Sequence, residues 1–255
     1  MRNVRYEELL PHQIVEARES CPIAYMAIGG LEWHGEQNCV GLDTVKANGI
    51  AIRCAEAAGG LRFPPLFYGE NREAYLMETN HDPGELIKQK MGLPPENFAP
   101  GYMGVAVQEQ DSRYVELLIH ILREIRSLGF RIITIIAGHY PLRSHGTAAA
   151  EWFNCMARPL TARAWCTSGY ELVRDEIPEA GDHAGAWETS LMMALRPELV
   201  DLSVLPQDPG EKLIGVGGRD PRVYASPEFG ERGVEAVVKA ITSRAHELLR
   251  GMGPA

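Results

Sequence analysis

A short apolar run that ends in two glycines and is followed by two potential metal ligands is the feature that most constrains this chain. Residues 22–28 are apolar and stop at Gly29-Gly30, so we expect a buried strand that leads into a tight turn. Glu32 and His34 follow this turn. Because side chains two residues apart in an extended segment point to the same side, these two donors converge. The segment outlines a metal site at a sheet edge.

Asp43 adds a second carboxylate nine residues after His34, directly before Thr44 and a predicted helix that ends at Gly59-Gly60. A helix N-terminus favours an acidic residue, so a simple cap explains Asp43 when it is taken alone. Beside Glu32 and His34, a metal ligand is the better explanation. Oxygen and imidazole donors together suit zinc, manganese or iron better than calcium, which takes oxygen ligands only. We expect a divalent ion, with zinc or manganese as the first choice.

The composition is that of an acidic globular protein. Its 255 residues and hydrophobic share of 45% support a substantial core, and we expect one domain over residues 1–255. Lys and Arg total 25 against 34 Asp and Glu, and the formal net charge of −9 argues against nucleic acid and anionic membranes as partners. The five cysteines lack a Cys-x-x-Cys spacing, as expected for free thiols in a reducing cytoplasm. Without an apolar leader or an 18-residue apolar run, the chain is expected to be cytoplasmic.

The hydrophobic pattern alternates between strands and helices. Residues 61–67 form a second apolar stretch, which Pro64-Pro65 restricts to a strand end or a sheet edge. Residues 108–128 have helical periodicity, and residues 131–136 resemble a central parallel strand that is buried on both faces. The other predicted elements are helices at 146–157, 186–195 and 231–249 and a short strand at 163–167. This order predicts an α/β fold with a mostly parallel sheet and helices on both sides.

Two stretches carry weaker signals. Residues 68–103 show little periodicity, and so long an irregular stretch in a compact domain is typical of a functional loop or an interface arm. Residues 215–218 are rich in glycine, but they follow no convincing strand and open no helix. They are therefore a weak candidate for a phosphate loop.

His139 follows the predicted central strand, as Glu32 and His34 follow the first one. Ligands collect at the carboxyl ends of strands in open parallel sheets, and Gly138 lets the backbone bend next to this histidine. Taken alone, His139 is more often structural. Its position after a buried strand leads us to count it as a ligand.

A third segment, residues 181–190, contains Asp182, His183 and Glu188 among small residues. Both carboxylates also suit a helix N-terminus, as a cap and as a residue favoured by the helix dipole. Next to a metal, an Asp-His pair is typical of a proton-transfer group, because histidine exchanges protons near neutral pH and a carboxylate can tune it. We therefore expect His183 and Asp182 to be catalytic.

Taken together and in this order, the segments resemble the creatininase (creatinine amidohydrolase) family. The resemblance lies in residues 29–36 with Asp43, residues 137–140, residues 182–190 and residues 217–230, and it covers nearly the whole chain. It implies a three-layer α/β/α sandwich with a mostly parallel central sheet, a divalent metal site that is often dinuclear, and assembly into hexamers.

The resemblance also implies roles for single residues. Glu32, His34, Asp43 and His139 correspond to metal ligands, with Asp43 as the bridge between two ions. Glu188 corresponds to a ligand or a residue close to one, and His183 to a group that assists proton transfer. One position departs from the family. Where creatininase has a carboxylate two residues beyond the metal-binding histidine, and many relatives have a Gly-Gly-Asn run, this chain has Pro141 and then Leu142.

Because proline offers no donor, a second ion must rely on Glu188 or water, or be absent, and creatinine is no longer the expected substrate. We expect a metal-dependent amidohydrolase that cleaves a C–N bond of a small cyclic amide, formamide or related substrate with a metal-activated water. His183, oriented by Asp182, would protonate the departing nitrogen, since an amide anion is too basic to leave.

Two alternatives stay open. One is a metal-dependent isomerase or lyase, which the lack of an obvious Schiff-base or proton-shuttling lysine beside the ligands disfavours. The other is a non-catalytic or degenerate metal-binding member of the same fold. A serine nucleophile is not expected, because the chain has no G-x-S-x-G elbow and Ser144-His145 lies on an apparent loop with no oriented acid beside it.

Overall fold

A parallel sheet of four strands forms the centre of the part of the chain that the structure describes. The computed structural model describes residues 3–69, 85–94, 96, 101–102, 104–156, 161–208 and 210–253. The strands are β1 (Ile23–Ile28), β2 (Leu61–Leu66), β3 (Ile132–Ala137) and β4 (Arg163–Thr167). Their order across the sheet is β2-β1-β3-β4, and every neighbouring pair is parallel.

Every residue of β1 and β3 is buried, as their continuous apolar sequences predict for strands covered on both faces. β2 lies at one edge of the sheet, as Pro64-Pro65 led us to expect. Its pairing with β1 is irregular between Met26 and Ile28, opposite these prolines.

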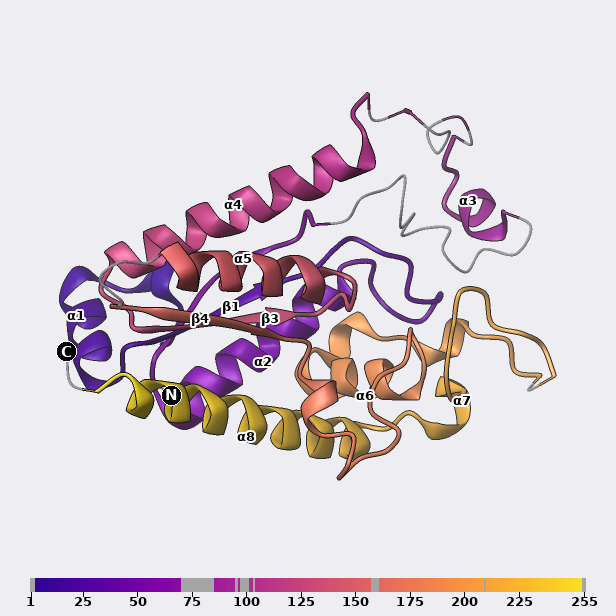
Figure 1. Cartoon of the computed structure of the whole chain (residues 1–255). Helices are drawn as coiled ribbons and strands as arrows, with labels where there is room; N and C mark the ends of the chain where they lie inside the picture. The colour runs from indigo at the N-terminus through magenta and orange to yellow at the C-terminus, as the bar shows by residue number, and fades with distance from the viewer. Residues whose placement is uncertain are drawn as a thin grey trace.

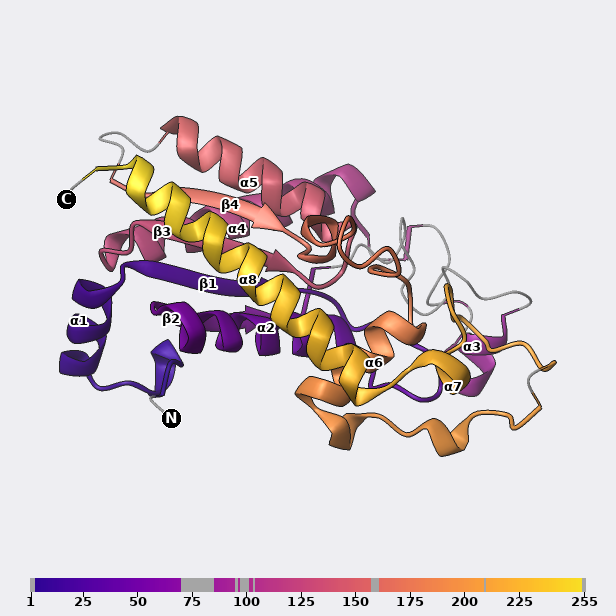
Figure 2. The ribbon, with the colours of Figure 1, turned by 90° about the horizontal axis from the view of Figure 1, so that it is seen from below.

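Helices cover both faces of this sheet (Figure 1). α4 (Val107–Ser127) and α5 (Leu142–Met156) pack on one face, where Ala24, Met26 and Ile28 of β1 point. α2 (Leu42–Ala58) and α8 (Pro227–Gly251) cover the other, where alternate β1 residues such as Tyr25 lie. Figure 2 shows α8 running across the sheet. Successive strand residues point to opposite faces, so each face of the sheet has its own apolar core and the molecule has three layers.

The remaining helical segments are short. They are α1 (Pro11–Ser20), α3 (Leu86–Lys90), α6 (Ala186–Leu195), α7 (Pro221–Tyr224) and the 3-10 turns Tyr6–Glu8, Tyr170–Leu172, Pro197–Leu199 and Leu202–Val204. In Figures 1 and 2 the strands point toward α6, whereas the chain termini lie near the opposite end of the sheet. The first turn of α2, the loop before it and the start of α6 thus lie beyond the carboxyl ends of the strands.

Most predicted elements are present, with shifted ends. α5 begins at Leu142, four residues before the predicted start, so Ser144 and His145 lie in its first turns. α8 begins at Pro227, where the Ser226 side chain accepts a hydrogen bond from the backbone of Phe229. Most of residues 70–100 lie outside the described chain, so the expectation of a functional loop or interface arm there stays a prediction. Among the described residues, no helix has the length and apolar character needed to cross a membrane.

Candidate metal centre

The expected ligands lie just beyond the carboxyl ends of the two central strands. The chain leaves β1 at Ile28 and reaches Glu32 and His34 before α2 begins, and it reaches His139 two residues after Ala137 ends β3. Ile28 pairs with Ala137 in the sheet, so the two strand ends lie side by side. The parallel register therefore brings these two donor segments together.

Two glycines allow α2 to start against these strand ends. A Cβ at Gly138 would lie 2.0 Å from the carbonyl oxygen of Asp43, and a Cβ at Gly29 would lie 2.8 Å from the backbone nitrogen of Thr44. Gly138 does not have a positive φ. The sequence suggested that Gly138 serves a backbone bend, whereas the structure shows that it serves close packing against Asp43.

Glu32, Asp43 and His139 form a first group of donors. His139 Nδ1 lies 2.8 Å from Glu32 Oε2 and 3.1 Å from Asp43 Oδ2. All three side chains are buried. Within the described chain, Glu32 Oε2 has no partner that meets hydrogen-bond geometry. A buried carboxylate oxygen in this state is costly unless a cation balances it.

His34, Asp43 and Glu188 form a second group. His34 Nε2 lies 3.3 Å from Asp43 Oδ1 and 3.5 Å from Glu188 Oε2. Asp43 thus belongs to both groups, with Oδ2 facing the first and Oδ1 facing the second. Glu188 lies on the first turn of α6, where its Oε2 also accepts a hydrogen bond of 2.8 Å from the Ala184 backbone.

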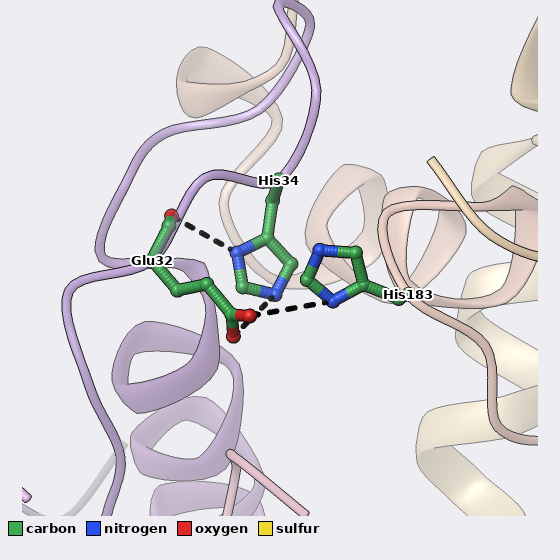
Figure 3. A group of neighbouring side chains, drawn as sticks. All are labelled: Glu32, His34 and His183. Carbon is green, nitrogen blue, oxygen red and sulfur yellow. Dashed lines mark hydrogen bonds and ion pairs between the residues drawn. The ribbon is translucent and has the colours of Figure 1, made fainter. Parts of the chain in front are cut away.

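His183 approaches from the segment before α6 and faces the His34 ring (Figure 3). The two ring centroids are 4.5 Å apart, and His183 Nδ1 lies 3.8 Å from Glu32 Oε1. His183 Nε2 lies 3.0 Å from the carbonyl oxygen of Trp33. Its side chain is 22% exposed, more than that of any of the five expected ligands. Burial first, and then the neighbouring His34, lower its pKa.

These spacings fit a divalent ion. Nitrogen and oxygen ligands about 2.1 Å from one ion lie about 3.0–3.5 Å from each other. The groups Glu32–Asp43–His139, His34–Asp43–Glu188 and Glu32–His34–His183 each offer ligand atoms that lie within 4.8 Å of one another. Combined with the burial of its three carboxylates, this mixed imidazole and carboxylate set is of the kind that binds zinc or manganese.

The carboxylates also shift the pKa of the buried imidazole. Burial alone would lower the pKa of His34, but Asp43, Glu188 and Glu32 raise it to about 9. Burial would raise the pKa of Asp43, yet His34 and Lys46 hold it well below its usual value. A ligating imidazole must be neutral, so a divalent ion competes with the proton on His34.

Asp182 lies at the N-terminus of α6. Its Oδ2 accepts a hydrogen bond of 2.8 Å from the Trp187 backbone, and its Oδ1 accepts one of 3.1 Å from the Glu188 backbone. Burial and Glu188 raise its pKa to about 7. These contacts match the helix-cap explanation of Asp182. Its expected action on His183 stays a prediction.

Lys46 is the site residue that the sequence analysis missed. It lies one turn after Asp43 on α2 and is buried, with Nζ bonded to Glu188 Oε1 and 3.4 Å from Asp43 Oδ1. A lysine thus lies beside the expected ligands, where the sequence showed no obvious Schiff-base or proton-shuttling lysine. Burial alone would lower the pKa of Lys46, but Glu188 and Asp43 hold it above its usual value. The i, i+3 spacing from Asp43 is the signal that places both side chains on one helix face.

The glycine-rich segment 215–218 supports the site through its backbone. Gly217 and His183 exchange two backbone hydrogen bonds, of 2.7 and 3.2 Å. Ala184 follows with a φ of 56°, a left-handed conformation that is uncommon for a residue with a side chain. This conformation accompanies the hydrogen bond from the Ala184 N–H to Glu188.

Ser144 and His145 have an acid beside them after all. His145 Nε2 lies 3.2 Å from Asp111 Oδ1, which corrects the expectation that no oriented acid is present. However, Ser144 Oγ donates its hydrogen bond to the Pro141 carbonyl oxygen, at 2.7 Å. Ser144 Oγ also lies 3.3 Å from His145 Nδ1, but this contact is longer than the one to Pro141, so the shorter hydrogen bond takes the proton that an activated nucleophile would give to the histidine.

The comparisons with known proteins give one family for nearly the whole chain. The family model described as Creatininase, creatinine amidohydrolase, matches residues 7–244. A creatinine amidohydrolase from Pseudomonas putida is 26% identical over 256 residues, which span 88% of this chain and 89% of the relative. The resemblance noted in the sequence is confirmed.

Solved structures of creatininase share the fold. A point mutant of the Zn-Zn type has a TM-score of 0.69 at 22% identity, over 97% of this chain and 98% of that one. A point mutant complexed with creatine has a TM-score of 0.70 at 22% identity, over 100% of both chains. A structure described as Creatininase Mn has a TM-score of 0.67 at 23% identity, over 96% of this chain and 98% of that one. The predicted α/β fold with a parallel sheet is confirmed.

Proposed function

Because this chain belongs to the creatininase family, we propose that it is a metal-dependent amidohydrolase that cleaves a C–N bond of a small cyclic amide, formamide or related substrate. The observation that carries the proposal is the meeting of buried imidazole and carboxylate donors from three distant segments, within ligand distance of one another. The relatives described as Zn-Zn type and Mn creatininases support zinc or manganese as the ion, and the creatine complex supports a small-molecule substrate.

We assign the ion to Glu32, Asp43 and His139, with His34 and Glu188 beside it. A divalent ion there would lower the pKa of water toward neutrality and would polarise a carbonyl group. The chain's own residues exclude bulk water, since all five side chains are buried. Buried charges act more strongly on a reacting group than exposed ones, because little solvent screens them.

His183 moves the proton in this proposal. Its side chain is more exposed than those of the five expected ligands, so a substrate can reach its ring. If Nε2 donates to the Trp33 carbonyl oxygen, Nδ1 is the atom that accepts a proton from the attacking water. The same atom can then deliver the proton to the departing nitrogen, which cannot leave as an anion.

The two alternatives are less well supported. A Schiff-base lysine needs a lowered pKa, whereas Lys46 is held charged by Glu188 and Asp43. Buried carboxylates at ligand distance leave uncompensated charge when no cation is bound. A degenerate site that no longer binds metal would have no reason to keep them.

Assembly into a homo-oligomer, a hexamer by family resemblance, is part of the proposal, and light scattering of the purified chain tests it.

Metal analysis and a substrate panel test the function. We expect purified wild-type protein to bind a divalent ion and to hydrolyse at least one member of a panel of small amides, lactams and formamides. His139→Ala should lose both the ion and turnover. His120→Ala, at an exposed histidine on α4, is the control and should lose neither. Full metal content in His139→Ala, or wild-type protein that binds no divalent ion, would contradict the proposal.

A further inference from the structure

Lys46 places a fixed positive charge inside the donor cluster. Its Nζ bonds Glu188 Oε1 and lies 3.4 Å from Asp43 Oδ1, and the side chain is only 9% exposed. We propose that the Lys46 ammonium takes the place of a second metal ion, so that the site binds one divalent ion per chain, at Glu32, Asp43 and His139. This inference rests on the proposed function, because it assumes that the cluster binds metal at all.

The two cations divide Asp43 between its oxygens. Oδ2 faces the first donor group, 3.1 Å from His139 Nδ1, and Oδ1 faces Lys46. A second ion at His34, Asp43 and Glu188 would have to coordinate Oδ1 beside the ammonium. Asp43 therefore bridges one metal ion and one lysine, instead of the two ions that the family resemblance implies.

Glu188 is occupied in the same way. Its Oε1 is bonded to Lys46, and its Oε2 accepts the hydrogen bond from the Ala184 backbone. Pro141 contributes no donor in the position where creatininase has a carboxylate. In the second group, Asp43 and Glu188 both contact the ammonium, and His34 is the remaining donor.

The charges support the same arrangement. Glu32, Asp43 and Glu188 are the three carboxylates whose oxygens lie at the cluster, and both oxygens of Asp182 face the start of α6. With His34 and His139 neutral, one divalent ion and one ammonium neutralise three carboxylates. A second divalent ion would leave an excess of positive charge in a buried site, which is costly.

Metal stoichiometry tests the inference directly. Wild-type protein is incubated with excess Zn²⁺ or Mn²⁺, desalted and analysed for metal per chain, and we expect one ion. Lys46→Met keeps an unbranched side chain one atom shorter and removes its charge, and we expect two ions per chain. Lys239→Met, at an exposed lysine on α8, is the matched control and should bind one.

Electron paramagnetic resonance of the Mn²⁺-loaded protein gives a second readout that does not depend on activity. We expect an isolated-ion spectrum for the wild type and an exchange-coupled pair for Lys46→Met. If circular dichroism shows that Lys46→Met does not fold, Lys46→Gln replaces it with the same expected result.

The outcomes separate the two proposals. Two ions per wild-type chain, or a coupled Mn²⁺ pair in wild type, overturns the role of Lys46 and leaves the amidohydrolase proposal standing. One ion per chain in a folded, uncharged Lys46 variant overturns it as well. A wild-type chain that binds no ion removes the basis of both proposals.

Discussion

Gly138→Ala is expected to damage the fold and the metal centre together. The added Cβ would lie 2.0 Å from the carbonyl oxygen of Asp43 and 2.5 Å from its carbonyl carbon. Cβ atoms essentially never come closer than 3.0 Å to a heavy atom outside their own residue and its chain neighbours, so the backbone of Asp43 has to move by about 1 Å. This neighbour is the main chain of a buried helix start and cannot rotate away as a side chain would.

The size of the effect follows from the kind of atom that must move. Overpacking in a buried region costs about 1–3 kcal/mol, and we expect the upper end because the helix backbone must shift. For a chain of this size, about 3 kcal/mol corresponds to a fall in melting temperature of roughly 6–12 °C. A metal site tolerates errors in ligand distance of only about 0.2 Å, so metal affinity should fall as well.

Thermal unfolding and metal titration of the variant measure both effects. Gly251→Ala is the control, because its Cβ meets no described heavy atom within 4 Å at the end of α8. It should change stability by at most about 1 kcal/mol, in the stabilising direction, since alanine favours helix more than glycine does. A melting temperature of Gly138→Ala within 1 °C of wild type, with unchanged metal affinity, would refute the reasoning about close packing.

Three further changes test separate parts of the structure. His183→Ala should keep its metal and lose roughly 10²–10⁴-fold in kcat, measured by metal analysis and steady-state kinetics, because proton transfer typically contributes this much; loss of the ion instead would make His183 a ligand. Asp182→Ala should lower the free energy of unfolding by about 1–2 kcal/mol, measured by denaturant unfolding. Asp182→Asn can still cap α6, so its free energy of unfolding should fall much less. A large fall in kcat with Asp182→Asn at unchanged stability would instead support an action of Asp182 on His183. Burial would raise the pKa of Glu171, but hydrogen bonds from Ser168 and Thr167 hold it below its usual value. The ionised carboxylate therefore stabilises the fold above about pH 5. This stabilisation is lost as the pH falls through the pKa of Glu171 in the folded state. Glu171→Gln should therefore be less stable than wild type by about 1 kcal/mol at pH 7, allowing for partial exposure, and the gap in denaturant unfolding should close below pH 4; a gap independent of pH would contradict this account.

The sequence was sufficient for the sheet and for several of the side chains that gather at the candidate site, because both depend on local pattern. Continuous apolar runs such as residues 132–137 can be buried on both faces, and their strand ends carry the polar side chains at one edge. Glu32 and His34 could be recognised by residue type and by their place after a strand. The parallel register, with Ile28 opposite Ala137, then brings them to His139.

What the sequence could not supply depends on contacts between distant segments. Local sequence signals give Asp182 two explanations, a helix cap and a proton-transfer partner, because both fit a carboxylate just before a helix. Only the hydrogen bonds to the α6 backbone show that the cap is formed. The need for glycine at position 138 also comes from a distant segment. The backbone of Asp43, ninety-five residues earlier in the chain, leaves no room there for a Cβ.

Lys46 shows why a site's charge is harder to predict than its ligands. On a helix that starts at Leu42, a lysine one turn after Asp43 would ordinarily be a surface partner of that carboxylate, worth a few tenths of a kcal/mol. It is buried instead because Glu188, from a helix 142 residues away, brings a second carboxylate to the same point. A cluster with three carboxylates in a buried volume requires compensating positive charge, and a chain can supply part of it with an ammonium. The number of metal ions that such a site binds therefore depends on how many of its charges are already compensated by the protein as well as on its ligands.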